Sequence, residues 1–362
     1  MRAGGGVGAV AHDPRIAAVV RVLPEHWYDQ ETLLAALTSY WARKHHNPER
    51  LAELHRAVGV KGRNLALPLE AYPGLDGLQK SNDAWIGAAT SLGEAAVRKA
   101  LGQAGLAPAD VGHFYSVTST GLSVPSLEAR IANRLGMPHE LRRTPIFGLG
   151  CAAGAGGTAR AADALRAFPG DAAVMLSVEL CSLTLQRDDG SIANAVASGL
   201  FGDGAAAVVL CGAGRPGPGP RVLATRSVLW RDTEWVMGWD FVDTGFRVVL
   251  SGRVPEVIRG NVAADVDAFL GAHGLARRDV RHWVAHTGGP KVLSAFGEAL
   301  ALPEEALARS RRSLAEVGNL SSASVLFVLG DLLDSGEARE GDYGLLAAMG
   351  PGFGAELLLL RW

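Results

Sequence analysis

The chain is organised around Thr144-Pro-Ile-Phe-Gly-Leu-Gly-Cys151-Ala-Ala-Gly-Ala-Gly-Gly157, which continues as an alanine-rich segment to Phe168. The pattern predicts a buried strand, a tight turn, and a helix that starts at or just after Cys151. A helix N-terminus presents free N–H groups and a partial positive charge, which favour the thiolate form of a cysteine held there. Cys151 is therefore either a nucleophile or one of the buried structural cysteines that are common in proteins.

The composition describes a compact folded protein. The chain has 362 residues, of which 48% are hydrophobic and 20% are charged, so a large core is expected and disorder is not. The formal net charge is −2, and basic residues form only short clusters such as Arg309 to Arg312. Binding to nucleic acid therefore has no electrostatic support.

The cysteine content and the hydropathy bear on location. Cys151, Cys181 and Cys211 form no secreted disulfide framework, so reduced thiols in the cytoplasm are the simpler interpretation. No stretch of about 18 uncharged apolar residues is present, so we expect no membrane span. The Gly- and Ala-rich start, Met1 to Val10, is soon followed by charged residues and does not resemble a signal peptide.

The first hundred residues alternate between extended and helical patterns. An apolar run predicts a first strand over residues 15–23. Gly105 is placed to end the last helix of this region, and Lys61 and Arg63 lie near a turn. The predicted helices span residues 31–44, 48–58 and 82–104.

An internal repeat shows how the chain is divided. Gly105-Leu-Ala-Pro-Ala-Asp-Val-Gly-His-Phe114 recurs 169 residues later as Gly274-Leu-Ala-Arg-Arg-Asp-Val-Arg-His-Trp283. Each copy follows a predicted helix and leads into a predicted strand, at residues 115–118 and 284–286. The Gly/Pro-rich run 212–220 separates the copies. We therefore predict two similar α/β halves, residues 1–215 and 216–362, each closing on a glycine turn and an apolar strand at 202–210 and 352–360.

The repeat gives Cys151 a counterpart. The offset of 169 residues carries position 151 to position 320, next to Asn319. Asn319 precedes the apolar segment 320–333, which predicts a buried helix. If the halves pack about a two-fold axis, both helices point their N-termini at one centre, and the nucleophile interpretation of Cys151 becomes the stronger one.

Two further residues would complete such a centre. A cysteine nucleophile needs a base or cationic partner, and His286 ends the repeated strand just before a Thr-Gly-Gly-Pro turn. The alternative for His286 is a satisfied core histidine. Asn319 offers an uncharged amide donor for an oxyanion or enolate, and its alternative role is a helix N-cap.

Several other site types are excluded or left open. His282 and His286 are four residues apart, but no glutamate or second Cys/His cluster completes a zinc site. The glycine loops fit no nucleotide fingerprint. We therefore expect no metal. The cluster of Trp230, Trp235 and Trp239 is either core packing or the wall of a pocket.

Taken together, these motifs resemble the type III polyketide synthases, the chalcone synthase-like branch of the thiolase-fold condensing enzymes. The resemblance covers nearly the whole chain and implies two pseudo-symmetric α/β halves in a five-layered αβαβα core. Its motifs are Gly148-Leu-Gly-Cys-Ala-Ala-Gly, Gly199-Leu-Phe-Gly-Asp-Gly-Ala, Trp283-Val-Ala-His-Thr-Gly-Gly, Gly318-Asn-Leu-Ser-Ser and Gly350-Pro-Gly-Phe-Gly.

The resemblance implies a reaction. Cys151 would take a starter acyl group from coenzyme A, and His286 would hold Cys151 as thiolate. His286 and Asn319 would stabilise the enolate that forms when malonyl-CoA, or a substituted malonyl-CoA, loses CO2. The enolate attacks the acyl thioester in a Claisen condensation that repeats. Phe201 matches the family's gatekeeping phenylalanine, and the substrates are acyl-CoA and malonyl-CoA with no metal or redox cofactor.

The resemblance also indicates substrate-binding positions. Trp239 stands where the plant pattern has glycine, Val248 where it has a second aromatic gatekeeper, and Val124 where a methionine reaches into the neighbouring subunit. Lys61 and Arg63 match the region that binds coenzyme A phosphates, and ordinary surface charge is their alternative. The positions that shape the starter cavity are Ser119, Thr120, Cys181, Thr184 and Ser321.

The expected product class follows the bacterial members that the segments 179–187 and 239–246 most resemble. These make alkylpyrones or alkylresorcinols from fatty acyl starters, although Trp239 would shorten the cavity. Three alternatives stay open: a single-round ketoacyl-carrier-protein synthase, a Cys/His thioester hydrolase and a catalytically silent scaffold. The resemblance further implies a homodimer, and an acyl carrier protein is a further candidate starter donor.

Overall fold

A computed structural model of the chain describes residues 13–41, 47–215 and 217–362. The Met1–Val10 segment and the end of the helix predicted over 31–44 lie outside these residues. None of the helices in the described parts is both long enough and apolar enough to cross a membrane.

The described residues build one nine-stranded sheet, in the order β11-β12-β13-β8-β1-β7-β6-β4-β5. β4 pairs in parallel with β5 and β6, and β11 with β12, while the other pairs are antiparallel. The halves meet where β1 pairs with β8. The strands are β1 (Arg15–Val22), β4 (Val111–Val117), β5 (Arg142–Ile146), β6 (Ala172–Leu180), β7 (Asp203–Cys211), β8 (Arg221–Leu229), β11 (Val280–Ala285), β12 (Tyr343–Gly350) and β13 (Gly354–Arg361).

The two halves repeat the same strand order. β1-β7-β6-β4 in the first half corresponds to β8-β13-β12-β11 in the second. In each copy of the repeat an aspartate closes a 3-10 turn: Asp110 Oδ2 accepts from Ala107 N and Asp279 Oδ2 from Ala276 N, both at 2.8 Å. The strands therefore begin inside the repeat, directly after each aspartate, and earlier than predicted.

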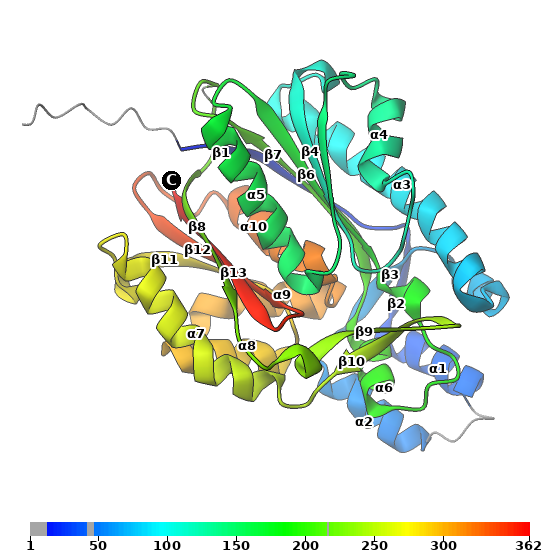
Figure 1. Ribbon diagram of the computed structural model, residues 1–362. Helices are drawn as coiled ribbons and strands as arrows, with labels where there is room; N and C mark the ends of the chain where they lie inside the picture. The colour runs from blue at the N-terminus through cyan, green and yellow to red at the C-terminus, as the bar shows by residue number, and fades with distance from the viewer. Residues whose placement is uncertain (1–12, 42–46, 216) are drawn as a thin grey trace, which may run out of the picture.

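The helices complete five layers (Figure 1). α5 (Ala153–Ala167) and α10 (Ser324–Ser335) lie between the two parts of the sheet, and their apolar side chains share one core cluster with both. Two further clusters join the outer helices to the outer sheet faces. The predicted αβαβα arrangement of two pseudo-symmetric halves is confirmed. The outer helices are α3 (Gly77–Ala104) and α4 (Leu127–Leu135) on one side, and α7 (Val254–Gly271) and α8 (Pro290–Leu300) on the other.

Small residues permit the close approach of the two central helices. A Cβ added at Gly154, in the first turn of α5, would come closer than 3.0 Å to the backbone carbonyl oxygen of Ser322. No side chain fits between backbones at that separation. The alanine- and glycine-rich sequence after Cys151 therefore reflects the packing of α5 against the start of α10.

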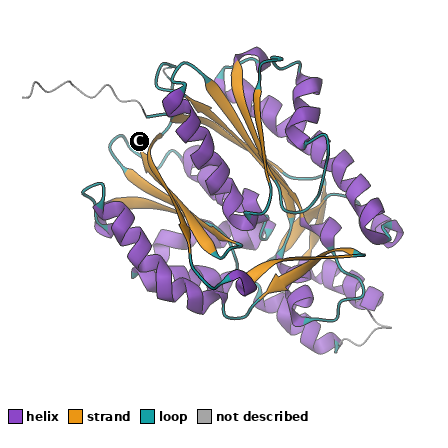
Figure 2. Ribbon diagram, viewed as in Figure 1, coloured by secondary structure: helices purple, strands orange, loops and turns teal. Residues whose placement is uncertain are grey.

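A cap of shorter elements covers one end of the central helices (Figure 2). The cap consists of α1 (Gln30–Trp41), α2 (Pro48–Ala57), α6 (Ile192–Leu200), the β2–β3 hairpin (His26–Asp29 with Gly62–Leu65) and the β9–β10 hairpin (Met237–Val242 with Gly245–Leu250). α9 (Ala308–Val317) packs against β3.

Most predicted elements are present, with two notable differences. α3 begins at Gly77, five residues before the predicted start, and ends at Gly105, whose φ is +67°. The strand before Cys151 was predicted to be buried, and this is wrong. β5 lies at the edge of the sheet, and Arg142, Arg143, Thr144 and Pro145 are exposed, as is typical of a protected edge strand.

Candidate active site

Cys151 lies in a 3-10 turn, Gly150–Ala152, that runs directly into α5. The turn is possible because Gly150 has a φ of +46°, in the left-handed region. The second half has the same construction: Ser321, with a φ of +47°, opens the 3-10 turn before α10. Two matched turns thus start the two central helices.

The match corrects the predicted counterpart of Cys151. The two turns align Gly150 with Ser321 and therefore Cys151 with Ser322, while Asn319 lies before the second turn. The second half has two more residues between the end of the repeated segment and this turn, so the offset of 169 residues does not hold at this point. α10 accordingly begins at Ser324 and not at position 320.

The Cys151 thiol is 5% exposed, and its Sγ lies 3.5 Å from Ser321 Oγ. Burial is the main cause that raises the pKa of Cys151 to about 12; the hydrogen bond with Ser321 opposes it, and the carboxyl of Glu179 adds to it. Burial thus acts against the thiolate form that the helix N-terminus favours. A base has to take the proton when the sulfur reacts.

Asn319 is fixed beside Phe201 by main-chain hydrogen bonds. Its N–H donates to Leu200 O over 2.9 Å, and its carbonyl accepts from Gly202 N at 3.0 Å. The side-chain Oδ1 accepts from Ser321 N at 2.8 Å and from Ser324 Oγ at 3.3 Å. Asn319 is thus not a helix N-cap, since Leu320 and Ala323 hold those positions, and its Oδ1 instead closes a local turn before Ser321. Among the described residues no hydrogen bond uses Nδ2, which is left as a donor.

His286 directly follows β11 and is 2% exposed. Its N–H donates to Ala347 O on β12 over 2.9 Å, and its Nδ1 has no hydrogen-bond partner among the described residues. Burial lowers the pKa of His286 to about 4. The imidazole is therefore neutral near pH 7 and can accept a proton.

The segments that carry these three residues pack on one another. A Cβ at Gly350, the last residue of β12, would meet Leu149 O at 2.5 Å, so β12 ends against the Cys151 turn. A Cβ at Gly289, in the turn after His286, would lie 3.8 Å from a methyl carbon of Leu200. Leu200 thus touches the His286 turn and accepts the Asn319 N–H.

A cavity of about 230 Å³ opens onto Cys151. Apolar side chains such as Leu65, Leu69 and Leu183 form much of its wall. Val124 is 97% exposed, and neither it nor Lys61 lines the cavity of this chain; His286 and Asn319 lie beside the cavity wall and not among its lining residues. The predicted positions that do line it are Ser119, Thr120, Cys181, Thr184, Phe201, Trp239, Val248, Ser321 and Arg63.

The three tryptophans have separate places. Trp230 is buried against Phe353, with ring centroids 5.4 Å apart, and Trp235 is 46% exposed. Trp239 on β9 lines the cavity. Both interpretations of the tryptophan cluster are thus partly right, and only Trp239 belongs to the pocket.

Glu179 is a site residue that the sequence reasoning missed. It is fully buried behind Cys151 and accepts hydrogen bonds from Ser119 N and Thr120 Oγ1, both at 2.9 Å. A chain of hydroxyls, Ser321 to Ser119 at 3.1 Å and Ser119 to Glu179 at 3.1 Å, joins this carboxyl to the thiol. The available signal was a single carboxylate in the mostly apolar strand β6.

The expectation for Arg63 is wrong, because Arg63 is only 3% exposed. A side chain enclosed to that degree cannot reach coenzyme A phosphates in solvent at the mouth of a tunnel. Lys61 is exposed and donates its backbone N–H to Ala315 O of α9. It stays a candidate on the sequence argument alone.

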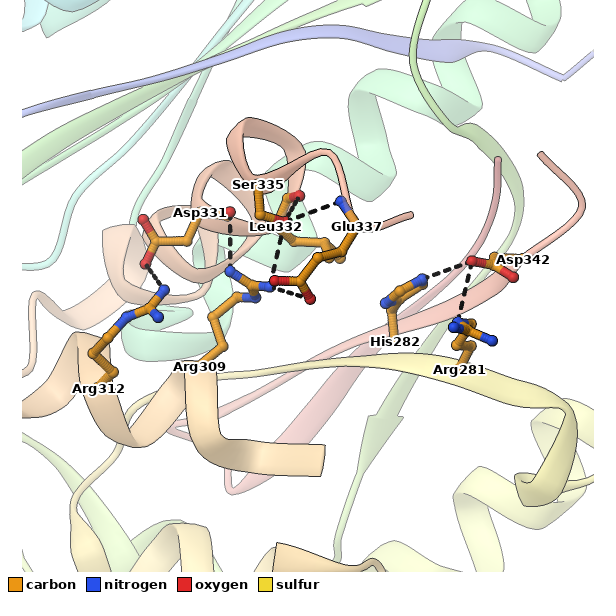
Figure 3. A network of polar contacts seen from close by, with 9 residues as sticks. All are labelled: Arg281, His282, Arg309, Arg312, Asp331, Leu332, Ser335, Glu337 and Asp342. Carbon is orange, nitrogen blue, oxygen red and sulfur yellow. Dashed lines mark hydrogen bonds and ion pairs between the residues drawn. The ribbon is translucent and has the colours of Figure 1, made fainter. Parts of the chain in front are cut away.

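His282 lies away from the site and pairs with an aspartate. Its Nε2 lies 3.0 Å from Asp342 Oδ2, as Figure 3 shows, next to Arg281. The repeat places the matching pair, His113 and Asp171, 3.1 Å apart in the first half. His282 therefore repeats the role of His113, whereas His286 has no counterpart in the first copy and lies at the site.

The arrangement suits acyl transfer with a protected carbanion. It combines a buried thiol, a neutral imidazole, a free amide donor and a mostly apolar cavity. A protonated thiol needs the imidazole as base to attack a thioester. The amide N–H can stabilise an oxyanion or enolate that develops nearby.

Comparison with known proteins agrees with this chemistry. The model of the chalcone and stilbene synthase N-terminal domain matches residues 15–215, and that of the C-terminal domain matches residues 222–362. The chain is 50% identical, over 96% of its length and 93% of the relative, to a 1,3,6,8-tetrahydroxynaphthalene synthase of Streptomyces peucetius subsp. caesius. It is 32% identical, over 94% and 97%, to a phloroglucinol synthase of Pseudomonas fluorescens. Among solved structures, the tetrahydroxynaphthalene synthase of Streptomyces coelicolor A3(2), a bacterial type III polyketide synthase, has a TM-score of 0.91 at 34% identity, covering 96% of this chain and 99% of that one.

Proposed function

Since the chain belongs to the chalcone and stilbene synthases, and is thus a type III polyketide synthase that condenses malonyl-CoA on a thiolase fold, we propose that Cys151, His286 and Asn319 carry out its reaction. The observation that carries this proposal is the convergence of their three segments. The Cys151 turn, the His286 turn and the Asn319 bridge meet around Leu200 and the end of β12.

The first step is acylation of Cys151. His286, neutral near pH 7, takes the thiol proton while the sulfur attacks the carbonyl carbon of a starter thioester. The carbon–sulfur bond to coenzyme A breaks, and the imidazolium returns its proton to the leaving thiolate. Coenzyme A thioesters are the substrates, and no further cofactor enters this scheme.

The second step forms the carbon–carbon bond. When malonyl-CoA loses CO2, the electron pair of the broken bond stays on the thioester as an enolate. The Nδ2 donor of Asn319 stabilises the enolate oxygen, assisted by His286. The carbanion then attacks the acyl group on Cys151, and Phe201 keeps water away while it exists. Repetition lengthens the chain.

For the starter, we propose a short malonyl-derived group that leads to a polyhydroxylated aromatic product. The relative that is 50% identical is a tetrahydroxynaphthalene synthase. The cavity of about 230 Å³ is smaller than the 300–1,000 Å³ of most ligand pockets, and Trp239 fills part of the wall. The sequence-based expectation of a fatty acyl starter and an alkylpyrone or alkylresorcinol is the second candidate, favoured by the leucines of the lining.

Other expectations join the proposal without a direct test in the structure. They are the division of the chain near residue 215, a homodimer, and an acyl carrier protein as starter donor. The homodimer would place the exposed Val124 at the subunit interface. The mostly apolar cavity supports a synthase over a thioester hydrolase, because hydrolysis needs a path for water.

Isotope labelling tests the proposal. The purified protein receives carbon-13 malonyl-CoA, alone or together with a C6 to C12 acyl-CoA, and the products are analysed by mass spectrometry. A fully labelled aromatic product from malonyl-CoA alone is the expected result. An unlabelled alkyl chain extended by labelled units would select the fatty acyl candidate, and free fatty acid without malonyl-derived carbon would overturn the synthase function. A single extension would identify a single-round enzyme.

A further inference from the structure

The buried guanidinium of Arg63 has no role in the steps described so far. Arg63 lies on β3, is 3% exposed and lines the cavity. Its Nη1 donates to the main-chain carbonyl of Phe201 over 2.7 Å, and its Nε has no partner among the described residues. Burying a cation in this way costs free energy, so we expect the contact between Arg63 and Phe201 to have a structural role that offsets this cost.

The nearby carboxyl of Asp203 does not neutralise Arg63 by direct contact. It attracts the guanidinium from a distance, which raises the pKa of Arg63 against the larger lowering by burial. The Asp203 oxygens accept instead from Ala66 N at 2.7 Å, from Ser182 N at 2.8 Å and from the Ser182 hydroxyl. The carbonyl of Phe201 is thus the only hydrogen-bond acceptor of the Arg63 side chain in the part of the chain that the structure describes.

Two glycines make room for the stem of Arg63. A Cβ at Gly318 would meet the Arg63 Cγ and Cδ at 3.1 Å, and a Cβ at Gly202 would meet its Cγ at 3.5 Å. Gly202 comes from the first half and Gly318 from the second. The aliphatic part of the Arg63 side chain therefore lies against both glycine motifs. Its guanidinium is held where the two motifs hydrogen-bond to each other.

Phe201 and Asn319 make this hydrogen-bonded contact between the two motifs. They pair as an isolated parallel bridge, in which Leu200 O accepts from Asn319 N and Gly202 N donates to Asn319 O. The bridge holds the backbone of the gate residue beside the backbone of the amide donor. The bridge lies outside the named strands of the described residues, and the hydrogen bond from Arg63 ties it directly to β3.

We propose that Arg63 is a positioning residue, which anchors the Phe201–Asn319 bridge so that the gate and the enolate donor keep their places while the carbanion exists. This inference rests on the proposed function and adds a residue to it. Arg63 acts through the Phe201 carbonyl and contacts no reacting atom.

The consequence of losing the anchor is uncoupling. Decarboxylation of malonyl-CoA breaks one carbon–carbon bond, releases CO2 and leaves the electron pair on the enolate. In the intact site the enolate attacks the acyl thioester of Cys151. With a loosened gate it takes a proton from water, which gives acetyl-CoA and hydroxide, and no new carbon–carbon bond forms.

The experiment compares Arg63→Met and Arg63→Lys with the wild type and with Arg309→Met. Arg309 is the matched control because it also donates to a main-chain carbonyl, Asp331 O at 3.0 Å, from the first turn of α9 towards α10 (Figure 3). Each protein receives carbon-14 malonyl-CoA. CO2, acetyl-CoA and condensed product are then counted, and the melting temperature is measured in parallel.

For Arg63→Met, acetyl-CoA formed per carbon–carbon bond is expected to rise about tenfold, the factor that corresponds to one lost charge-assisted hydrogen bond. Arg63→Lys, which keeps a cationic donor, is expected to restore part of the coupling. Arg309→Met is expected to keep the wild-type ratio, whatever its melting temperature. If Arg63→Met does not fold, the ratio in Arg63→Lys, intermediate or unchanged, decides.

An unchanged ratio, with decarboxylation and condensation reduced in equal proportion, would overturn the positioning role and leave Arg63 a structural residue. Failure of the proposed function gives a different result, because the wild type would then form no malonyl-derived product. The two failures are thus distinguished by the wild-type reaction alone.

Discussion

Substitution of Gly154 by alanine tests the contact at the centre of the fold and of the site. The added methyl group would come closer than 3.0 Å to Ser322 O, which is backbone and cannot rotate away. The starts of α5 and α10 would have to separate by about 1 Å. Cys151 lies directly before α5, so the same displacement moves the nucleophile.

The size of the effect follows from two opposing terms. Alanine gains about 1 kcal/mol over glycine inside a helix, and overpacking a tight contact costs up to about 3 kcal/mol. We therefore expect Gly154→Ala to lose about 2 kcal/mol in the free energy of unfolding. A displacement of about 1 Å at the nucleophile is expected to lower turnover about 100-fold.

Gly87→Ala is the matched control, because Gly87 lies in α3 with no other heavy atom within 4 Å of its added Cβ. It is expected to gain about 0.5 to 1 kcal/mol. Urea unfolding followed by circular dichroism, together with malonyl-CoA turnover, compares the two variants. A Gly154→Ala protein as stable as Gly87→Ala, with wild-type turnover, would refute the reasoning.

Three further predictions concern buried groups. Glu179→Gln removes a charge that raises the pKa of Cys151, so iodoacetamide should alkylate Cys151 faster at pH 8. A slower reaction would show that the Glu179 carboxyl does not face the thiol. Burial lowers the folded-state pKa of His55 to about 4, so its contribution to stability is complete above its usual pKa and declines as the pH falls towards 4. Between pH 6.5 and pH 5 the loss is about 2 kcal/mol in urea unfolding, and His55→Gln should lose that much less than the wild type over the same interval; an equal loss would contradict this. Asn319→Ala should abolish most CO2 release from malonyl-CoA while Cys151 still accepts an acyl group, and normal release would remove its enolate role.

The sequence was informative wherever a local pattern has one physical meaning. The glycine-lined turn at Cys151, the stop at Gly105 and the repeat that ends in β4 and β11 predicted the two halves, and the resemblance to the type III polyketide synthases implied their five layers. The repeat also singled out His286, at the end of the repeated strand, as a partner for Cys151.

The remaining features depend on packing between distant segments. The pairing of Cys151 with Ser322 required the two extra residues in the second half to be seen in space. Arg63 looks like a surface cation, and only the fold shows that it is enclosed between two glycine motifs. The exposure of β5 likewise depends on its place at the sheet edge.

The protonation of the Cys151 thiol and the His286 imidazole could not be predicted from the sequence, because it depends on burial. A helix N-terminus alone favours a thiolate, but the enclosure of Cys151 acts in the opposite direction and is the larger effect. The buried carboxyl of Glu179 acts in the same direction as burial. We therefore expect the acylation of Cys151 to begin with transfer of the thiol proton to the imidazole of His286.

The most direct test of that account is to find the acylated residue. The protein is incubated briefly with an acyl-CoA or malonyl-CoA, quenched in acid and digested, and the peptides with Cys151, Cys181 and Cys211 are examined by mass spectrometry. The account predicts a thioester adduct on Cys151, which is absent in Cys151→Ala together with all chain extension. An adduct on Cys181 or Cys211 that persists in Cys151→Ala would contradict it.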